Sequence, residues 1–193
     1  IVVQDRVLDP AEILEKLHVR TIQQLHQENS EFDVPDGMDV GLVAINRTEN
    51  ILKFAGAKRP LVYLKNGELD LVKGNRRSIG GLLESTSRSF STVTLDLFQV
   101  DQFFLFSDGY TDQYGGPKNK KFKSKALYAL FEEIAGQTIS KQRERLEQVF
   151  EEWKWNEEQI DDVLVVGVKL DAIDSGWKQP QDSVTDTSKS VGS

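Results

Sequence analysis

A series of short apolar segments separated by turn signals limits what this chain can fold into. Asn66-Gly67 lies between two of them and is the dipeptide most typical of a two-residue β-hairpin. Residues 47–50 form a second expected turn, and residues 90–100 and 102–106 are expected to pair as a further hairpin. Hairpins join antiparallel neighbours, so the sheet structure is predicted to be mainly antiparallel. The expected strands are residues 38–46, 51–57, 61–65, 68–73, 90–100, 102–106 and 162–170.

Three other segments carry apolar residues at helical spacing. The first begins at Asp9, which can cap a helix, continues with Pro10 at the first helical position, and extends to about residue 27. The others lie near residues 125–135 and 141–153. Strands with interspersed helices predict an α+β fold in which the helices pack against the sheet structure.

Length and composition bound the domain organisation. A chain of 193 residues can bury one ordinary hydrophobic core, which we assign to residues 1–170. Residues 171–193 are rich in Ser, Asp, Thr, Lys and Gln, and are predicted to be a disordered tail or linker. The chain begins at Ile1 in the middle of a segment, so we expect it to be a piece of a longer protein.

Charge and cysteine content exclude several functional classes. The net charge of −7 argues against a nucleic-acid-binding protein, which would need a basic face. The absence of cysteine excludes a disulfide framework, a thiolate nucleophile and a cysteine-based zinc site. No apolar run is long enough to span a bilayer, and no signal-peptide pattern opens the chain. We therefore expect a cytoplasmic protein with no membrane association in this part of it.

Acidic residues lie at the ends of two apolar segments. Asp108 follows residues 102–106, and Asp161-Asp162 lead into the last expected strand. If these strands are adjacent, Asp108 and Asp161 meet at one sheet edge, where two carboxylates repel unless a proton or a cation lies between them. Carboxylate oxygens suit Mg²⁺ or Mn²⁺, and Gly109 would let the backbone turn and approach the ion closely. The alternative is that Asp108-Gly109 is a turn and Asp161 a strand cap, and the spacing leaves both open.

Five sequence blocks in a fixed order resemble one family of enzymes. The blocks are FLFSDGYTDQYGGPKNKKF, DGMDVGLVAIN, LKFAGAKRPLVYLKNGEL, RRSIGG and DDVLVVGVKL. Over about residues 1–170 the chain is similar to the SpoIIE/RsbU-type branch of the PP2C (PPM) metal-dependent serine/threonine phosphatases. The resemblance implies a PP2C-like β-sandwich of mainly antiparallel sheets flanked by helices.

The resemblance also implies an activity. It is the hydrolysis of phosphoserine or phosphothreonine in a bacterial regulatory protein by water activated by two Mn²⁺ or Mg²⁺ ions, without a side-chain nucleophile. The implied partners are a phosphoprotein substrate such as an anti-sigma-factor antagonist and a sensor domain in the parent protein, which would act in signal transduction and sigma-factor regulation.

Individual residues take roles by this resemblance. Asp108 and Asp161 match metal ligands, and Asp162 lies where relatives often carry Asn, which makes it a candidate to support a ligand. Asp112 is a candidate for a further, weaker metal, with a solvated loop acid as the alternative.

The chain departs from the family pattern in one respect. Relatives carry an Asp-bearing strand and an Asp-x-x-Gly-His-Gly block before the helix that starts at Asp9, and neither motif is present here. The chain is therefore expected to supply only half of the metal ligands, and to be inactive without the rest. The alternative function is a non-catalytic, phosphatase-like module that binds a signalling partner.

Basic residues near Asp108 are candidates for contact with the substrate. Lys118, Lys120 and Lys121 follow the Asp108 segment in an otherwise acidic chain and could steer a phosphoprotein towards it. Arg59 could contact phosphate. The alternatives are a solvated lysine loop and an arginine that holds the loop before Pro60.

Overall fold

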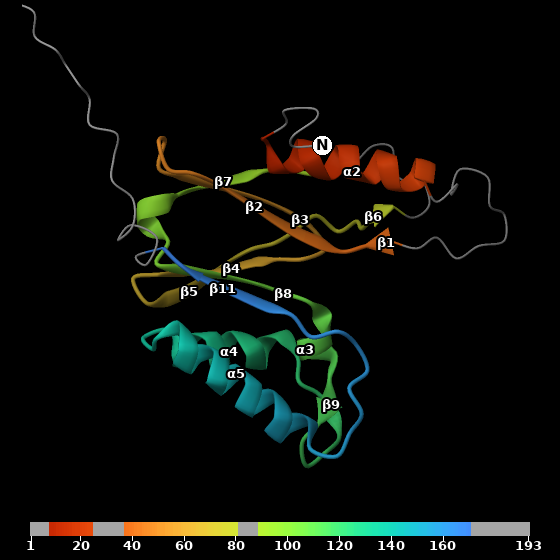
Figure 1. Cartoon of the computed structure of the whole chain (residues 1–193), viewed down its shortest axis with the longest axis vertical. Helices are drawn as coiled ribbons and strands as arrows, with labels where there is room; N and C mark the ends of the chain where they lie inside the picture. The colour runs from red at the N-terminus through yellow and green to blue at the C-terminus, as the bar shows by residue number, and fades with distance from the viewer. Residues whose placement is uncertain (1–7, 25–36, 81–88, 171–193) are drawn as a thin grey trace, which may run out of the picture.

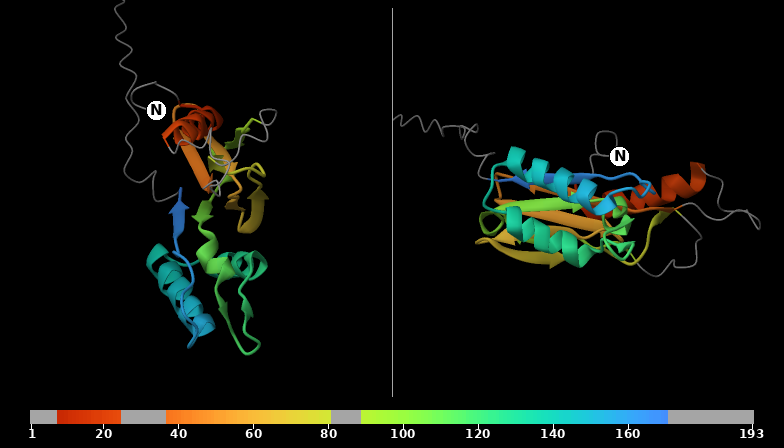
Figure 2. Two further views of the ribbon diagram at one scale, coloured as in Figure 1. Left: turned by 90° about the vertical axis from the view of Figure 1, so that its right-hand side faces the viewer. Right: turned by 90° about the horizontal axis from the view of Figure 1, so that it is seen from below.

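The molecule is built from two β-sheets packed face to face, with helices on both outer faces (Figure 1). The computed structural model of the chain describes residues 8–24, 37–80 and 89–170, so the expected tail at residues 171–193 lies outside the described residues. The order of layers is one helix, a three-stranded sheet, a four-stranded sheet and a pair of helices, as the side view in Figure 2 also shows. The predicted α+β sandwich of mainly antiparallel sheets is confirmed.

The three-stranded sheet has the order β2-β3-β7 and the four-stranded sheet has the order β11-β8-β4-β5, and all neighbours in both are antiparallel. The strands are β2 (Val40–Asn46), β3 (Ile51–Ala57), β4 (Leu61–Lys65), β5 (Glu68–Val72), β7 (Val93–Asp96), β8 (Gln102–Phe106) and β11 (Val165–Lys169). Two short ladders accompany them, β1 (Gly37–Met38) with β6 (Ile79–Gly80), and β9 (Tyr114–Gly115) with β10 (Lys120–Lys121).

Both predicted turns join paired strands. β2 and β3 pair in register around residues 47–50, and β4 and β5 pair around Asn66-Gly67. Asn66 and Gly67 both have positive φ, which is the backbone that a type I′ hairpin turn requires.

The predicted pairing of residues 90–100 with 102–106 is wrong. β7 pairs with β3 in the first sheet, whereas β8 pairs with β4 and β11 in the second. The 3₁₀ turn η1 (Leu97–Gln99) carries the chain from one sheet to the other, and the Asp96 side chain caps it by accepting a hydrogen bond from the Phe98 N–H. The segment is a crossover between layers, because the capped turn occupies residues that the prediction placed in the first strand of a hairpin.

Alternating side chains on the strands separate the core into layers. Leu61, Tyr63 and Phe103 point between the two sheets. Val62 and Phe104, their neighbours in sequence, point to the opposite face, where α4 (Ser124–Ile134) and α5 (Ile139–Lys154) cover the sheet. This alternation with a period of two is what a strand buried on both faces produces.

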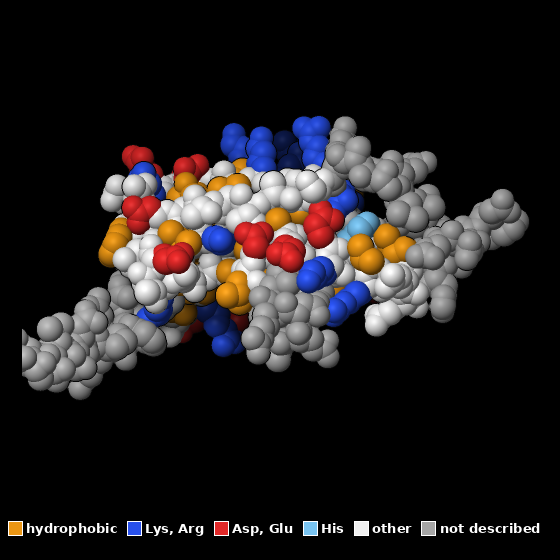
Figure 3. Space-filling model, turned by 90° about the horizontal axis from the view of Figure 1, so that it is seen from above, with side chains coloured by type: hydrophobic (Ala, Val, Ile, Leu, Met, Phe, Trp, Pro, Cys, Tyr) orange, Lys and Arg blue, Asp and Glu red, His pale blue; other side chains and the backbone are white. Residues whose placement is uncertain are grey.

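The helix α2 (Pro10–Gln24) covers the outer face of the three-stranded sheet. Its Glu15 accepts hydrogen bonds from the Arg77 guanidinium and from the Phe90 N–H, which ties the helix to the segments beneath it. The surface seen from the α2 side carries acidic and basic side chains next to one another (Figure 3). The three helix predictions are confirmed within the described residues.

Candidate functional site

The residues after β8 form a sharp junction between a strand and a helix. β8 ends at Phe106, Ser107 adopts an extended conformation, and Asp108 begins the short helix α3 (Asp108–Asp112). Phe106 and Tyr110, on either side, are buried. The chain direction at Asp108 is therefore fixed by packing on both sides, as a side chain with a defined role requires.

Ser107 joins the end of β8 to the segment that leads into β11. Its Oγ donates to the Asp162 carbonyl oxygen at 2.7 Å and accepts from the Leu164 N–H at 2.9 Å. Its own N–H donates to the Leu164 carbonyl oxygen at 3.0 Å. Ser107 was not predicted from the sequence, although its position as a polar residue between a buried strand and an acid was a usable indication.

Gly109 lets the two segments come into contact. A Cβ atom at this position would lie 2.3 Å from the Asp162 carbonyl oxygen and 3.2 Å from the Asp161 carbonyl oxygen. A side chain here would force the segments apart. The prediction that Gly109 allows a close approach of the backbone to an ion stays a prediction, because its close contact in the structure is with the backbone of Asp162.

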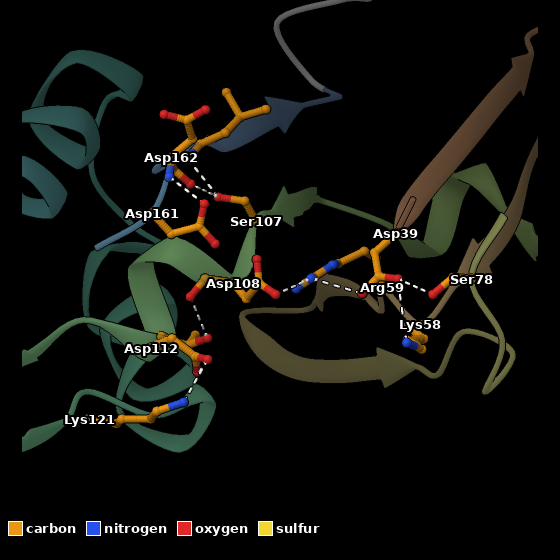
Figure 4. A network of polar contacts seen from close by, with 12 residues as sticks. Asp39, Lys58, Arg59, Ser78, Ser107, Asp108, Asp112, Lys121, Asp161 and Asp162 are labelled. Atoms are coloured by element: carbon orange, nitrogen blue, oxygen red, sulfur yellow. Dashed lines mark hydrogen bonds and ion pairs between the residues drawn. The ribbon is translucent and has the colours of Figure 1, made fainter. Parts of the chain in front are cut away.

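These contacts bring Asp108 and Asp161 to the same edge of the four-stranded sheet. Figure 4 shows the Asp161 carboxylate on the side of its backbone that faces Asp108, whereas the Asp162 carboxylate points away. The Asp161 Oδ1 atom accepts a hydrogen bond from the Asp162 N–H at 2.7 Å, which fixes the orientation of that carboxylate. Asp161 and Asp162 are both exposed, so the carboxylate of Asp161 remains accessible to a ligand.

Arg59 is the ion-pair partner of Asp108. Its Nη2 donates to Asp108 Oδ2 at 2.5 Å and to Asp39 Oδ2 at 3.0 Å, so that one guanidinium nitrogen bridges two carboxylates (Figure 4). Burial opposes ionisation of Asp108, but the hydrogen bond and the charge of Arg59 outweigh it and lower the pKa of the Asp108 carboxyl. The side chain of Asp108 is nevertheless 46% exposed.

Asp39 and Ser78 complete this network and were not singled out from the sequence. The Ser78 Oγ donates to Asp39 Oδ1 at 2.7 Å, and the Lys58 Nζ lies 3.9 Å from the same oxygen. Asp39 lies between β1 and β2, and Ser78 lies just before β6. Their signal was indirect, because they fall in two of the sequence blocks that carry the family resemblance.

Asp112 and the basic segment form a separate pair. The Lys121 Nζ donates to Asp112 Oδ2 at 2.8 Å, and this hydrogen bond raises the pKa of Lys121. Lys118 and Lys120 are exposed on the β9–β10 hairpin, and within the described part of the chain neither forms an ion pair. Lys121 is therefore held by an acid, while the other two lysines are free to meet an approaching anion.

The donor set suits a hard divalent cation in kind. Asp108 and Asp161 offer carboxylate oxygens from two neighbouring strand ends, the ligand type that Mg²⁺ and Mn²⁺ prefer. In the ranges that the structure describes, no group of three or more acidic or histidine side chains is arranged to hold a metal ion. The described residues therefore supply part of a metal site, and a complete site needs ligands from elsewhere.

None of the helices in the described ranges combines the length and the apolar character that crossing a membrane requires.

Comparisons with known proteins identify what the chain is similar to. A family model described as Stage II sporulation protein E (SpoIIE) matches residues 3–171. No curated protein matches the chain significantly. The SiaA-PP2C domain of Pseudomonas aeruginosa is a similar solved structure, with a TM-score of 0.71 and 28% identity. The match covers 84% of this chain and 61% of that one, so the chain spans less than two thirds of that structure.

Two more distant structures share the fold. They are the phosphatase domain of SpoIIE from Bacillus subtilis presoaked with Mn, with a TM-score of 0.51, and the serine/threonine phosphatase Stp1 from Staphylococcus aureus, with a TM-score of 0.52. Both are 14% identical to the chain, and the matches cover 82% of it. They cover 71% of the SpoIIE structure and 66% of the Stp1 structure.

Proposed function

The chain belongs to the SpoIIE family, and we propose that it supplies two carboxylate ligands, Asp108 and Asp161, to the divalent metal centre of a PP2C-type serine/threonine phosphatase. The observation that carries the proposal is the close contact of two acid-bearing strand ends, Ser107–Gly109 against Asp161–Asp162. The remaining ligands come, in this proposal, from a part of the domain that these residues do not include.

Each residue of the site has a defined task in the proposed reaction. Asp108 and Asp161 bind Mn²⁺ or Mg²⁺, which would neutralise phosphoryl charge and activate water for attack on the phosphoester. Ser107 and Gly109 hold the two ligand-bearing segments together. Asp162 supports the site through its backbone, and Asp112 is a candidate for a weaker ion once Lys121 releases it.

The proposed substrate is a phosphoserine or phosphothreonine residue in a bacterial regulatory protein, such as an anti-sigma-factor antagonist, acted on in the cytoplasm under the control of a sensor domain. Exposed Lys118 and Lys120 on the β9–β10 hairpin would attract such an anionic segment. Residues 1–170 form the phosphatase part of the chain and residues 171–193 a tail or linker.

One observation favours a second candidate, a phosphatase-like module that binds a signalling partner without hydrolysis. Asp108 is already paired with Arg59, and the described acidic residues do not form a group large enough to hold a metal. A chain that works with only these residues would bind a partner and turn nothing over.

Phosphate release from a phosphoserine peptide by the intact parent protein separates the two candidates. The enzyme reading predicts turnover that requires Mn²⁺ or Mg²⁺ and is abolished by Asp108→Ala with the circular dichroism spectrum unchanged. Glu68→Ala is the matched control, because Glu68 is an exposed acid of the same sheet and lies in the hairpin at the opposite end of β4. Undiminished turnover in Asp108→Ala would remove Asp108 from the mechanism, and a parent without metal-dependent turnover would leave the binding module.

A further inference from the structure

Arg59 lies where the chain passes from one sheet to the other. β3 of the three-stranded sheet ends at Ala57, and β4 of the four-stranded sheet begins at Leu61. The intervening Lys58 has a φ of 55°, a left-handed backbone conformation that is uncommon for a residue with a side chain. A conformation of this kind persists where the surrounding structure determines it, and such positions cluster at functional sites.

The backbone of Arg59 is held closely on its inner side. A Cβ atom on Gly56 would lie 2.1 Å from the Arg59 carbonyl oxygen, so the strand can pass this carbonyl only because residue 56 has no side chain. The Arg59 N–H donates to the Ala57 carbonyl oxygen at 2.7 Å, and the Lys58 N–H donates to the Asn75 carbonyl oxygen at 2.8 Å. The backbone position from which the Arg59 side chain extends is therefore fixed.

The two carboxylates bound to Arg59 differ in how firmly they are held. Asp39 is 24% exposed and has three described partners, the Arg59 guanidinium, the Ser78 hydroxyl and the Lys58 ammonium group. Asp108 is 46% exposed, and Arg59 is its only ion-pair partner in the part of the chain that the structure describes. Asp39 is therefore held in place by several contacts, whereas Asp108 can exchange Arg59 for another cation.

Arg59 also has N–H donors that take no part in its two ion pairs. Both of its hydrogen bonds come from Nη2, and the N–H groups on Nε and Nη1 have no partner among the described residues. A guanidinium presents its donors in a planar fork that matches the oxygen atoms of a phosphoryl group. The side chain is only 17% exposed, so its direction is largely determined by these contacts.

We propose that Arg59 is a phosphoryl-binding residue that is stored on Asp108 and becomes available when Asp108 binds a divalent cation, with Asp39 as the positioning residue that keeps Arg59 in place throughout. The proposal rests on the proposed function, because it assumes that Asp108 is a metal ligand. It names the group that the site recognises as a phosphomonoester dianion.

The ion pair between Arg59 and Asp108 has a consequence for metal affinity that can be measured without turnover. The positive charge of Arg59 beside Asp108 repels an approaching metal ion. Replacing Arg59 with a neutral residue should therefore strengthen metal binding. In the intact parent, Arg59→Gln should lower the Kd for Mn²⁺ by about threefold to tenfold, measured by electron paramagnetic resonance of free Mn²⁺. The same variant should raise the KM for a phosphopeptide and weaken inhibition by inorganic phosphate by about tenfold.

Two further variants separate charge from geometry. Arg59→Lys keeps the charge and loses the fork, so Mn²⁺ affinity should stay near that of the wild type while phosphate affinity falls. Asp39→Asn should weaken phosphate inhibition and leave Mn²⁺ affinity unchanged or lower, because Arg59 then has only Asp108 to hold it. Arg76→Gln is the matched control, since Arg76 is an exposed arginine in the neighbouring segment and its loss should alter neither quantity.

The Mn²⁺ and phosphate affinities of these variants either support or overturn the exchange of partners at Asp108. Tighter Mn²⁺ binding with weaker phosphate binding in Arg59→Gln supports the exchange of partners. Unchanged or weaker Mn²⁺ binding in that variant overturns it, even if the parent is an active phosphatase. A parent in which Asp108→Ala leaves Mn²⁺ affinity and turnover intact overturns the proposed function itself, and the two failures are thereby distinguishable.

Discussion

Gly109 allows the segment that carries Asp108 to approach the segment that carries Asp161 and Asp162 closely. Because a Cβ atom there would lie 2.3 Å from the Asp162 carbonyl oxygen, Gly109→Ala should lower the free energy of unfolding by about 1–3 kcal/mol. It should also reduce turnover in the intact parent. Gly136→Ala is the matched control, because no atom lies within 4 Å of its added Cβ, and it should change stability by less than about 1 kcal/mol. Urea unfolding of both variants is the measurement, and equal stabilities would show that the contact is not required.

The ion pair of Asp108 predicts a dependence of stability on pH. Arg59 lowers the pKa of Asp108 below its ordinary value of 3.8 in the folded protein. The pair therefore contributes its full stability above that value, and the contribution is lost as the pH falls through the lower, folded pKa. The stability difference between the wild type and Arg59→Gln, measured by urea unfolding, should be larger at pH 6 than at pH 3. A difference that stays constant over this range would contradict the pairing.

The sequence singled out the acids at this site, together with Arg59 and Gly109, but not the contacts that these residues make. Asp108 and Asp161 were predictable because each lies within a few residues of an apolar strand, which is a local pattern. The partnership of Arg59 with Asp108 joins residues 49 positions apart, and that of Ser107 with Asp162 joins residues 55 apart. Such contacts depend on which strands become neighbours, and hydrophobic periodicity carries no information about that.

At the scale of secondary-structure elements, hairpins were predictable where the turn residues themselves define them. Asn66-Gly67 fixes the β4–β5 pair by its backbone conformation. The crossover from β7 to β8 was not predictable in this way, because the two apolar segments lie close in sequence yet belong to different sheets. Proximity in sequence favours pairing but does not require it.

A buried glutamine pair attaches α5 to the four-stranded sheet. Gln102 of β8 and Gln142 of α5 are 1% and 3% exposed, and each amide donates to the other, at 2.6 and 3.0 Å. Gln102→Leu leaves the Gln142 Oε1 atom buried without its donor, although the Gln142 Nε2 still donates to the carbonyl oxygens of Ala135 and Gln137. Leaving one buried partner unsatisfied costs more than replacing both by apolar groups. Gln102→Leu should therefore destabilise the protein by about 1–3 kcal/mol, and Gln102→Leu with Gln142→Leu by less than the sum of the two single changes.

Exposed Gln148 of the same helix is the control for this cycle, and Gln148→Leu should leave stability within about 0.5 kcal/mol. Thermal unfolding of the four variants gives the coupling energy. Strictly additive losses at Gln102 and Gln142 would mean that the two amides act independently.

At the scale of the whole molecule, the site lies where the two sheets are tied together. Asp39 adjoins the first sheet and Asp108 the second, and Arg59 in the crossover between them holds both. A change at Arg59 is therefore expected to affect stability as well as phosphate binding. For this reason the metal affinity, rather than activity alone, is the informative measurement.

The division of the chain at residue 170 is a prediction at the same scale. The composition of residues 171–193 is too polar to add to a core. A chain ending at Leu170 should have a free energy of unfolding, measured in urea, within about 0.5 kcal/mol of that of the full chain. A clear loss of stability would mean that these residues pack against the domain.

The central claim is that Asp108 and Asp161, delivered by neighbouring strand ends, bind a shared divalent metal centre. Anomalous diffraction at the manganese absorption edge, from crystals of the intact parent grown with Mn²⁺, tests it most directly. We predict a manganese peak within coordination distance of carboxylate oxygens from both Asp108 and Asp161, with Arg59 turned away from Asp108 and still bound to Asp39. Manganese bound elsewhere, or an Asp108 that remains paired with Arg59 while the metal is present, would contradict the claim.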